Sequence, residues 1–478
     1  MTVIVLDVDF TDHYEVSDWG KTCRANVSPL VLGTVCARWR QIIHADERYW
    51  TSISISFGLG ADASFAQRML GLTEFYLDKS GSWSLFICLL TARSDYKNTI
   101  HLPVLNLLFR HHHRWILVDF DLPMHSFPDM PASLPMLRHF SLNSQTRGFR
   151  RPSAFSYPPH SPIASPDLTY LKLWGIERQL VQRMSNLGKL VQLSLISPDN
   201  PPYHSIDNIL NILQQCSSTL VYLRLQGPFT ELEVTPSRSI IVMNHVEEAD
   251  LDRAAIHFLP YLRLPHLSAF TANACLEVFP TATLLQFLKV CNPPLQHLTF
   301  HQVDMEYEPL MEILTTFPSL IELDFWLYGP RLTLFATPLL KRLSLTSCRS
   351  CEDILLPNLT HLEMGFEDDI EDSSSFDGTL FVETISSRFY LGRNPGLQPP
   401  CSPRCSKSSS TPGGGDRCRV KPLERLGLNG GRQQFSEEAH DMLARMKDDG
   451  LELETLWRDD DTDGSEPPDD DSESTRIV

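Results

Sequence analysis

Several features that would assign the chain to a class at once are missing from the sequence. No apolar run approaches the roughly 18 residues that a membrane-spanning helix needs, and Asp7 and Asp9 stand where a signal peptide would be basic and then apolar. Basic residues are in deficit, since the 478-residue chain has a formal net charge of -18. These absences argue against membrane and nucleic-acid partners and predict a cytoplasmic or nuclear location.

Catalytic and metal-binding spacings are missing as well. The sequence has no glycine-rich phosphate loop, no nucleophile elbow and no zinc-protease helix signature. His111, His112 and His113 are adjacent, so their side chains point in different directions and do not converge on one ion. The 11 cysteines are scattered, which predicts reduced thiols rather than a disulfide framework. We therefore expect no enzyme activity, no catalytic residues, no cofactor and no metal.

What the sequence does contain is a recurring phrase of one Leu, two variable residues, and two apolar residues separated by one. Between Leu168 and Leu359 its copies follow one another at intervals of 19 to 30 residues. This period resembles that of leucine-rich repeats, and the alternating apolar pair is typical of a short strand with one buried face. The leading residues of the copies are Leu137, Leu168, Leu190, Leu220, Val246, Leu267, Leu295, Leu320, Leu340, Leu359 and Leu423.

Ahead of the repeats lies a segment with helical spacing at residues 28–43. Ser28 as the cap and Pro29 at the first position predict one amphipathic helix there. Trp50 then leads into the alternating Ser-Ile-Ser-Ile of residues 52–55, which predicts a strand. The tryptophans of this segment are expected to pack in the core, with direct partner contact as the alternative. The apolar residues that define the segment are Leu32, Val35, Cys36, Trp39, Ile43 and Trp50.

Val-Cys-Ala-Arg-Trp-Arg at residues 35–40, with Trp50 and the strand after it, resembles the second half of the F-box-like motif of fungal proteins. Residues 76–82 and 111–115 resemble phrases that follow the motif in that family, whereas residues 1–27 lack its Leu-Pro-Pro-Glu opening. The resemblance implies a substrate receptor of a cullin-RING ubiquitin ligase. In such a receptor the F-box, here the six apolar residues above, docks on a Skp-type adaptor, and a repeat domain holds the substrate protein.

The expected fold is α/β, with a short N-terminal helical F-box-like segment followed by an irregular leucine-rich-repeat solenoid with a parallel concave sheet. Helices are expected on the outer face at residues 206–216 and 305–316. The expected divisions are a divergent N-terminus at 1–27, a partial F-box-like segment at 28–60, the solenoid at 61–390 with a loop at 144–166, a disordered insert at 391–419, the last repeat and cap at 420–458, and an acidic disordered tail at 459–478.

Two functions remain open at this point: a substrate receptor that recruits a ubiquitin ligase, or a repeat scaffold that binds a partner protein without recruiting one. Either would bind its partner through residues that point outward between the buried positions of each strand, His361 and Glu363 among them. Carboxylates on both sides of an aromatic favour a basic, partly apolar peptide. The partner-binding candidates are Lys172, Trp174, Tyr222, Arg224, Glu248, Asp250, Glu322, Asp324 and Trp326.

Overall fold

A computed structural model describes most of the repeat region and the helices before it. The chain divides into two compact units, a first unit of Met1–Leu267 with Val290–Pro293 and a second unit of Ser268–Lys289 with Pro294–Val478. The expected N-terminus at 1–27, most of the insert at 391–419 and the tail at 459–478 lie outside the described residues. The structure describes residues 29–58, 61–91, 99–122, 130–143, 162–175, 180, 183–196, 204–227, 229–230, 239–252, 254–273, 279–301, 307–326, 331–347, 354–365, 377–391, 393, 420–429 and 435–456.

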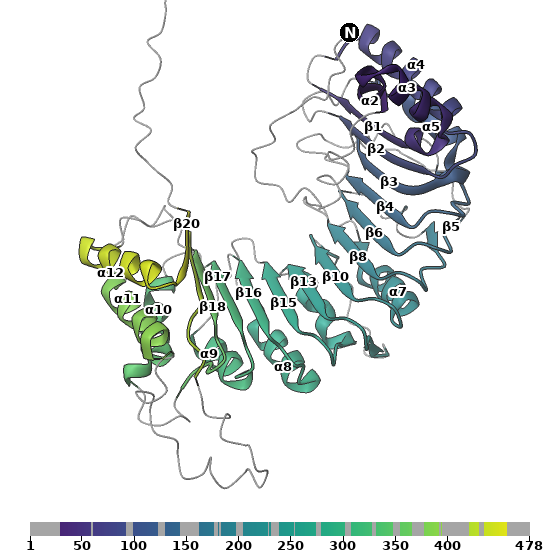
Figure 1. The fold of residues 1–478 in the computed structure, drawn as a ribbon. Helices are drawn as coiled ribbons and strands as arrows, with labels where there is room; N and C mark the ends of the chain where they lie inside the picture. The colour runs from purple at the N-terminus through teal and green to yellow at the C-terminus, as the bar shows by residue number, and fades with distance from the viewer. Residues whose placement is uncertain are drawn as a thin grey trace, which may run out of the picture. The chain divides into compact units, whose positions relative to one another are not determined.

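The first unit is built on a parallel sheet whose strands follow one another in chain order (Figure 1). Short parallel pairs outside this sheet join β5 (Ile163–Ala164) to β7 (Met184–Ser185), β9 (His204–Ser205) to β11 (Phe229–Thr230), and β12 (Ile241–Val242) to β14 (Leu262–Arg263). The strands of the main sheet are β1 (Ser52–Phe57), β2 (Leu85–Thr91), β3 (Trp115–Asp121), β4 (His139–Asn143), β6 (Tyr170–Trp174), β8 (Gln192–Ile196), β10 (Tyr222–Gln226) and β13 (Glu248–Asp252).

Helices connect several of these strands. The expected helix at 206–216 is confirmed as α7. The helices of the first unit are α2 (Pro29–Val35), α3 (Ala37–Ala45), α4 (Ala63–Lys79), α5 (Leu102–Arg110) and α7 (Ile206–Cys216), with the 3-10 helices η1 (Glu47–Trp50), η2 (His112–Arg114) and η4 (Ala255–Tyr261).

The second unit alternates strand and helix. Its strands are parallel neighbours in chain order: β15 (Ala269–Asn273), β16 (His297–His301), β17 (Glu322–Trp326), β18 (His361–Gly365), β19 (Arg425–Asn429) and β20 (Glu452–Leu456). Its helices are α8 (Thr281–Cys291), α9 (Tyr307–Thr316), α10 (Arg331–Leu343), α11 (Gly378–Ser386) and α12 (Glu437–Asp448), with η5 (Leu345–Ser347) and the π-helix η8 (Ser387–Leu391). In Figure 1, α8 and α9 lie together along one side of the strands. The helix expected at 305–316 is thus confirmed as α9.

Side-chain caps explain where three of the helices begin. Asp62, Asp377 and Ser436 precede α4, α11 and α12, and each side chain accepts a hydrogen bond from a backbone N–H three residues later, at 2.7, 2.9 and 3.2 Å. A cap of this kind satisfies a donor that has no partner inside the helix and contributes about 1 kcal/mol. Local sequence therefore sets these helix starts.

The repeated leucines form the core of both units. Every leading residue from Leu137 to Leu423 is buried, and the apolar pair after it alternates with outward residues along a strand in ten of the eleven copies. The expected parallel sheet is therefore confirmed. Each fully buried leucine contributes about 1.5–3 kcal/mol of transfer free energy, and the side chains of successive strands supply the core that a single strand lacks.

One copy of the phrase was assigned wrongly. Leu340 and Leu343 lie near the end of α10 and Leu345 begins η5, so this copy forms no strand. All three leucines are buried, and a three-residue step between apolar positions suits one face of a helix as well as the start of a repeat. The expected loop at 144–166 also needs correction, because Ile163 and Ala164 form β5; residues 144–161 lie outside the described part of the chain.

Candidate functional site

The single helix expected at residues 28–43 is in fact two helices. Cys36 has extended backbone angles, φ -161° and ψ 168°, and separates α2 from α3. Its sulfur accepts a hydrogen bond from the Trp39 N–H at 3.5 Å, so the cysteine caps the second helix. The break at Cys36 interrupts the continuous apolar face that one helix would have had; Leu32 is half-buried, and Ile43 is buried.

The two tryptophans of this segment have different surroundings. Trp50 is 1% exposed, donates from Nε1 to the Ile43 carbonyl at 2.9 Å, and meets Phe75 and Tyr76 edge to face at 5.1 Å. Trp39 is 47% exposed. Core packing was the expectation for both, and it is correct for Trp50 and wrong for Trp39.

Several other apolar side chains of α2, α3 and η1 are exposed. Ile42 lies three residues further along α3 and is 49% exposed, which puts it on the same side of the helix. Val35 at the end of α2 is 63% exposed, and Tyr49 in η1 is 44% exposed. We call Val35, Trp39, Ile42 and Tyr49 the N-terminal apolar patch. Such side chains, gathered on adjacent short elements, are typical of a surface that binds another protein.

The two sequence phrases at 76–82 and 111–115 meet in space. Arg114, which is buried, donates from Nε to the Trp83 carbonyl at 2.7 Å and from Nη2 to Oγ of Ser80 at 2.7 Å. Tyr76 of the first phrase packs against Trp50. These phrases therefore support the segment that carries the N-terminal apolar patch rather than forming a separate site.

The sheet of the first unit presents most of the expected partner-binding residues at matching positions. Lys172 of β6, Ser194 of β8, Arg224 of β10 and Asp250 of β13 share one register level. Trp174 and Tyr222 also face outward and are half-buried, and Glu248 is exposed. The outward phase expected for the weak copy at Val246 is confirmed, because Ala249 and Leu251 are buried.

Charges on this face are compensated within the first unit. Arg224 Nε lies 3.0 Å from Oδ2 of Asp250, and Gln226 Nε2 donates to Oδ1 of the same carboxylate at 3.1 Å. Asp252 accepts backbone hydrogen bonds from Gly227 and Ala255; burial nevertheless raises the pKa of Asp252 to about 6. Asp250 and Asp252 on β13 thus have structural partners, and they are poor candidates for binding a basic peptide.

Two aromatic residues on the same face, His139 and Tyr170, also have a close partner in each other. His139 stacks on Tyr170 with ring centroids 3.9 Å apart and planes 8° from parallel. Burial, with nearby Lys172 as the second cause, lowers the pKa of His139 to about 4, so its ring is neutral at physiological pH. The pair offers a flat aromatic surface and no positive charge.

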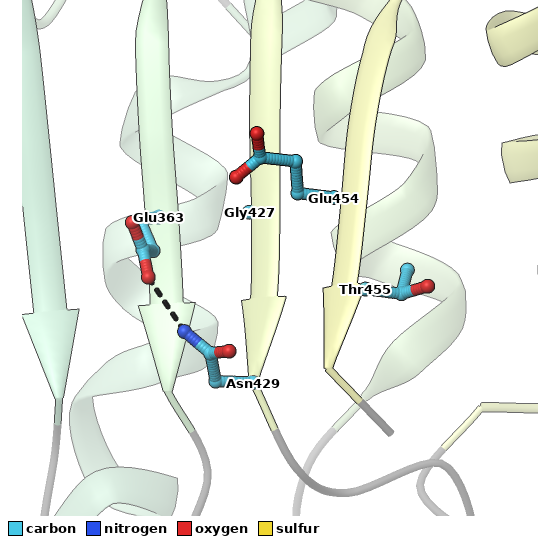
Figure 2. A pocket seen from close by; sticks show the side chains of 5 residues that line it. All are labelled: Glu363, Gly427, Asn429, Glu454 and Thr455. Carbon is cyan, nitrogen blue, oxygen red and sulfur yellow. Dashed lines mark hydrogen bonds between the residues drawn. The ribbon is translucent and has the colours of Figure 1, made fainter. Parts of the chain in front are cut away.

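The second unit presents a different surface, with three carboxylates at one level of the sheet. Asp324 of β17, Glu363 of β18 and Glu454 of β20 occupy that level, and Gly427 of β19 lies between the last two. We call Asp324, Glu363 and Glu454 the carboxylate row. A hollow of about 270 Å³ opens beside it, lined by Glu363, Gly427, Asn429, Glu454 and Thr455, and Figure 2 shows Glu363 and Glu454 on either side of Gly427.

At two positions in this sheet a glycine leaves room for a large side chain of the neighbouring strand. A Cβ atom on Gly427 would lie 2.8 Å from Cγ of Glu363, and one on Gly365 would lie 2.9 Å from Cδ2 of Trp326. Glu363 lies close beside Gly427 and accepts a hydrogen bond from Nδ2 of Asn429 at 2.5 Å; Figure 2 shows this bond. The indole of Trp326, expected to be an exposed anchor, is instead half-buried over Gly365.

The protonation of Asp324 is strongly perturbed. Burial, and then the nearby carboxylates of Glu363 and Glu322, raise the pKa of Asp324 from 3.8 to about 8. The indole N–H of Trp326 faces this carboxylate and opposes the rise, but the two groups fall short of hydrogen-bond geometry, and Oδ1 of Asp324 is buried without a hydrogen-bond partner. Glu322 itself lies 2.7 Å from Nδ1 of His297.

Asp324→Asn is expected to stabilise the second unit at pH 8 and to have little effect at pH 4. A carboxyl whose folded pKa exceeds its unfolded value gives stability that is present below the unfolded pKa and is lost as pH rises through the folded pKa. A shift from 3.8 to about 8, discounted for the solvent screening of a half-buried group, corresponds to about 1–3 kcal/mol at pH 8. Urea unfolding at the two pH values measures the difference.

The matched control for this experiment is Asp441→Asn, which changes an exposed carboxylate on α12. It should alter the free energy of unfolding by less than about 0.5 kcal/mol at either pH. Equal stability of wild type and Asp324→Asn at pH 8 would contradict the burial of this charge.

Metal binding finds no support in the described structure. Among the residues that the structure describes, no group of three or more His, Cys, Asp and Glu side chains is placed to hold a metal ion. The rings of His111 and His113 lie 6.4 Å apart, and Nδ1 of His112 lies 2.8 Å from the Phe109 carbonyl. Among the same residues, no helix is long and apolar enough to cross a bilayer.

Sequence reasoning missed part of the second surface. The sequence predicted that Glu363 faces outward, but it did not predict a site role for Asn429, Glu454 or Gly427. The alternation of Leu451 and Leu453 with Glu452 and Glu454 is the signal that could have revealed β20. The hollow itself depends on which residues become neighbours across strands, and one strand's sequence does not reveal that.

No protein-family model matches the chain, and no curated protein matches it either. The likeness to F-box-like and leucine-rich-repeat proteins therefore stays a prediction that depends on the residues quoted for it.

Proposed function

We propose that the chain is a protein-interaction module of the F-box substrate-receptor type. In this proposal α2 and α3 dock on a Skp-type adaptor of a cullin-RING ligase. The strands after them form an irregular leucine-rich-repeat solenoid whose outward sheet face holds a substrate protein. The module has no chemistry of its own, and its partners transfer the ubiquitin. Such a receptor would act in the cytoplasm or the nucleus.

The observation that carries the proposal is the N-terminal apolar patch. Apolar surface in contact with water is unfavourable, and burying it stabilises a protein or a complex by roughly 25 cal/mol for each Å². Binding an apolar partner surface recovers that free energy. Trp39 is the expected hot spot, because tryptophan is enriched among the residues that dominate interface energetics.

Further support comes from the parallel strands of both units, which helices connect throughout the second unit and at several places in the first. The parallel strands place outward residues at matched register levels, as repeat proteins do when they bind partners through an extended sheet face. This arrangement supports the second part of the proposal, in which the strands rather than the helices bind the substrate.

Trp39→Ala is expected to weaken binding of the full chain to a Skp-type adaptor about tenfold or more, which corresponds to a loss of at least about 1.4 kcal/mol. The reason is the loss of a large aromatic side chain from the N-terminal apolar patch. Isothermal titration of purified adaptor into wild type and variant measures the change, and thermal unfolding checks that both are folded.

Trp83→Ala is the matched control, because Trp83 is 49% exposed, lies in the first unit and is outside α2 and α3. It should bind the adaptor as wild type does. If folded wild type binds no adaptor at micromolar concentration, the ligase part of the proposal fails. The scaffold function, favoured by the absence of the motif's opening from residues 1–27, would then replace it.

A further inference from the structure

The outward positions of the last strands in the second unit carry far more negative than positive charge. Arg425 is the one cation at the outward positions of β17–β20 described here, and its Nη2 lies 2.8 Å from Oε2 of Glu454. A surface with this balance attracts a positively charged partner and speeds its encounter. The carboxylates at these positions are Glu322, Asp324, Glu363, Glu452 and Glu454.

Two observations distinguish the carboxylate row from an ordinary acidic surface. The first is the hollow beside Gly427, where the lack of a Cβ leaves room for the Glu363 side chain, and Asn429 donates to Oε1 of that carboxylate (Figure 2). The second is Oδ1 of Asp324, a buried carboxylate oxygen without a hydrogen-bond partner in the same row. A buried acceptor without a donor has a free-energy cost in the isolated protein, and Asp324 shares the sheet level of Glu363 without lining the hollow.

Size and charge together define what the hollow accepts. Its volume of about 270 Å³ lies just below the roughly 300–1,000 Å³ of pockets for drug-sized ligands, so it suits a single side chain. Asn429 uses Oε1 of Glu363 and Arg425 uses Oε2 of Glu454, and each carboxylate has a second oxygen that can accept from an ammonium or a guanidinium.

We infer that the hollow beside Gly427 takes a basic side chain, a lysine or an arginine, of a protein partner, with Glu363 and Glu454 as its counter-charges. This inference rests on the proposed function, because it names the partner class of the sheet face. Asp324 lies next in the row, and because its pKa is raised to about 8, its carboxyl is mostly protonated at neutral pH in the absence of a bound cation. A bound cation would offset the repulsion between Glu363 and Glu454 and favour ionisation of Asp324.

The test uses the full chain and a fluorescein-labelled peptide of alternating alanine and arginine as the probe, read by fluorescence anisotropy at physiological salt. Matching peptides with lysine or with uncharged citrulline in place of arginine form the other arms. Wild type should bind the arginine or the lysine peptide at least about tenfold more tightly than the citrulline peptide. No difference between charged and uncharged peptides would overturn the inference.

The double variant Glu363→Gln with Glu454→Gln should bind the charged probe peptide about tenfold more weakly than wild type. Glu437→Gln with Glu438→Gln makes the same change in net charge on exposed positions of α12 and should weaken probe binding less than about twofold. Equal weakening by both pairs would mean that the probe senses only net charge, and the inference would fail.

Gly427→Ala tests whether the space beside Gly427, and not only the negative charge, is needed for probe binding. The new Cβ would displace the flexible side chain of Glu363 without changing a charge, and we expect about threefold or greater loss of probe binding in a folded variant. Unchanged binding would place the cation elsewhere. Adaptor binding by the first unit, measured with the same proteins, reports separately on the proposed function.

Discussion

Trp50→Ala is expected to lower the free energy of unfolding of the first unit by about 3–5 kcal/mol, the range for truncating a buried Trp or Phe. The side chain is almost wholly buried, and its indole meets Phe75 and Tyr76 edge to face. Nε1 also donates to the Ile43 carbonyl at 2.9 Å, which ties η1 to α3. Truncation would leave a cavity and a carbonyl without its donor.

Trp39→Ala is the matched control for this prediction, because the same residue type in the same segment is about half exposed. It should cost at most about 1 kcal/mol of stability while weakening adaptor binding. Urea unfolding monitored by circular dichroism measures both variants. A similar loss for the two variants would contradict the different burial of their side chains.

Arg388→Met is expected to destabilise the second unit by about 3–5 kcal/mol, because it leaves three buried carbonyls without their charged donor. Arg388 is wholly buried in η8. Its Nε donates to the Leu343 carbonyl at 2.8 Å, Nη1 donates to the Leu356 carbonyl at 2.9 Å, and Nη2 donates to the Leu355 carbonyl. Methionine fills much of the space but satisfies none of these acceptors.

The backbone of Leu356 makes this arginine more important. Leu356 has φ +52°, in the left-handed region that costs a non-glycine residue roughly 1–2 kcal/mol. Hydrogen bonds from Arg388 to two successive carbonyls hold the turn in that conformation. The variant would therefore lose the bonds and the constraint on the turn together.

Arg393→Met is the control for Arg388→Met. Arg393 is exposed, lies over the Phe389 ring at 4.0 Å, and donates to the Asp449 carbonyl at 2.8 Å. It should cost about 1 kcal/mol or less. Thermal and urea unfolding of the two variants, compared with wild type, measure the effects. A small loss for Arg388→Met would show that water or other groups satisfy the three carbonyls.

The repeats were predictable from sequence because their signal is local. A buried leucine followed by two inward residues one position apart fixes both the strand and its phase, which is why Phe140 and Leu171 were assigned inward and are buried. The same signal failed at Leu340, where a three-residue step suited the face of α10. Local spacing cannot decide between strand and helix when both bury the same leucines.

The N-terminal segment was less predictable because its outcome depends on one backbone angle. Helical spacing ran without interruption through Cys36 in the sequence, but the extended conformation at that residue starts a new helix. Ile43 remains buried while Trp39 becomes exposed. The sequence grouped the apolar residues of this segment, but only the structure separates its buried members from its exposed ones.

The sequence by itself determined which residues alternate inward and outward, since strand periodicity is a property of neighbours along the chain. The tertiary structure alone decided which outward charges have partners, since pairing depends on the register between strands that are far apart in sequence. That register gives Asp250 its arginine, leaves Oδ1 of Asp324 without a hydrogen-bond partner, and brings Glu363 over Gly427. Burial and the neighbours across strands determine how stable each ionised side chain is. Both are fixed only when the strands lie side by side in the folded protein.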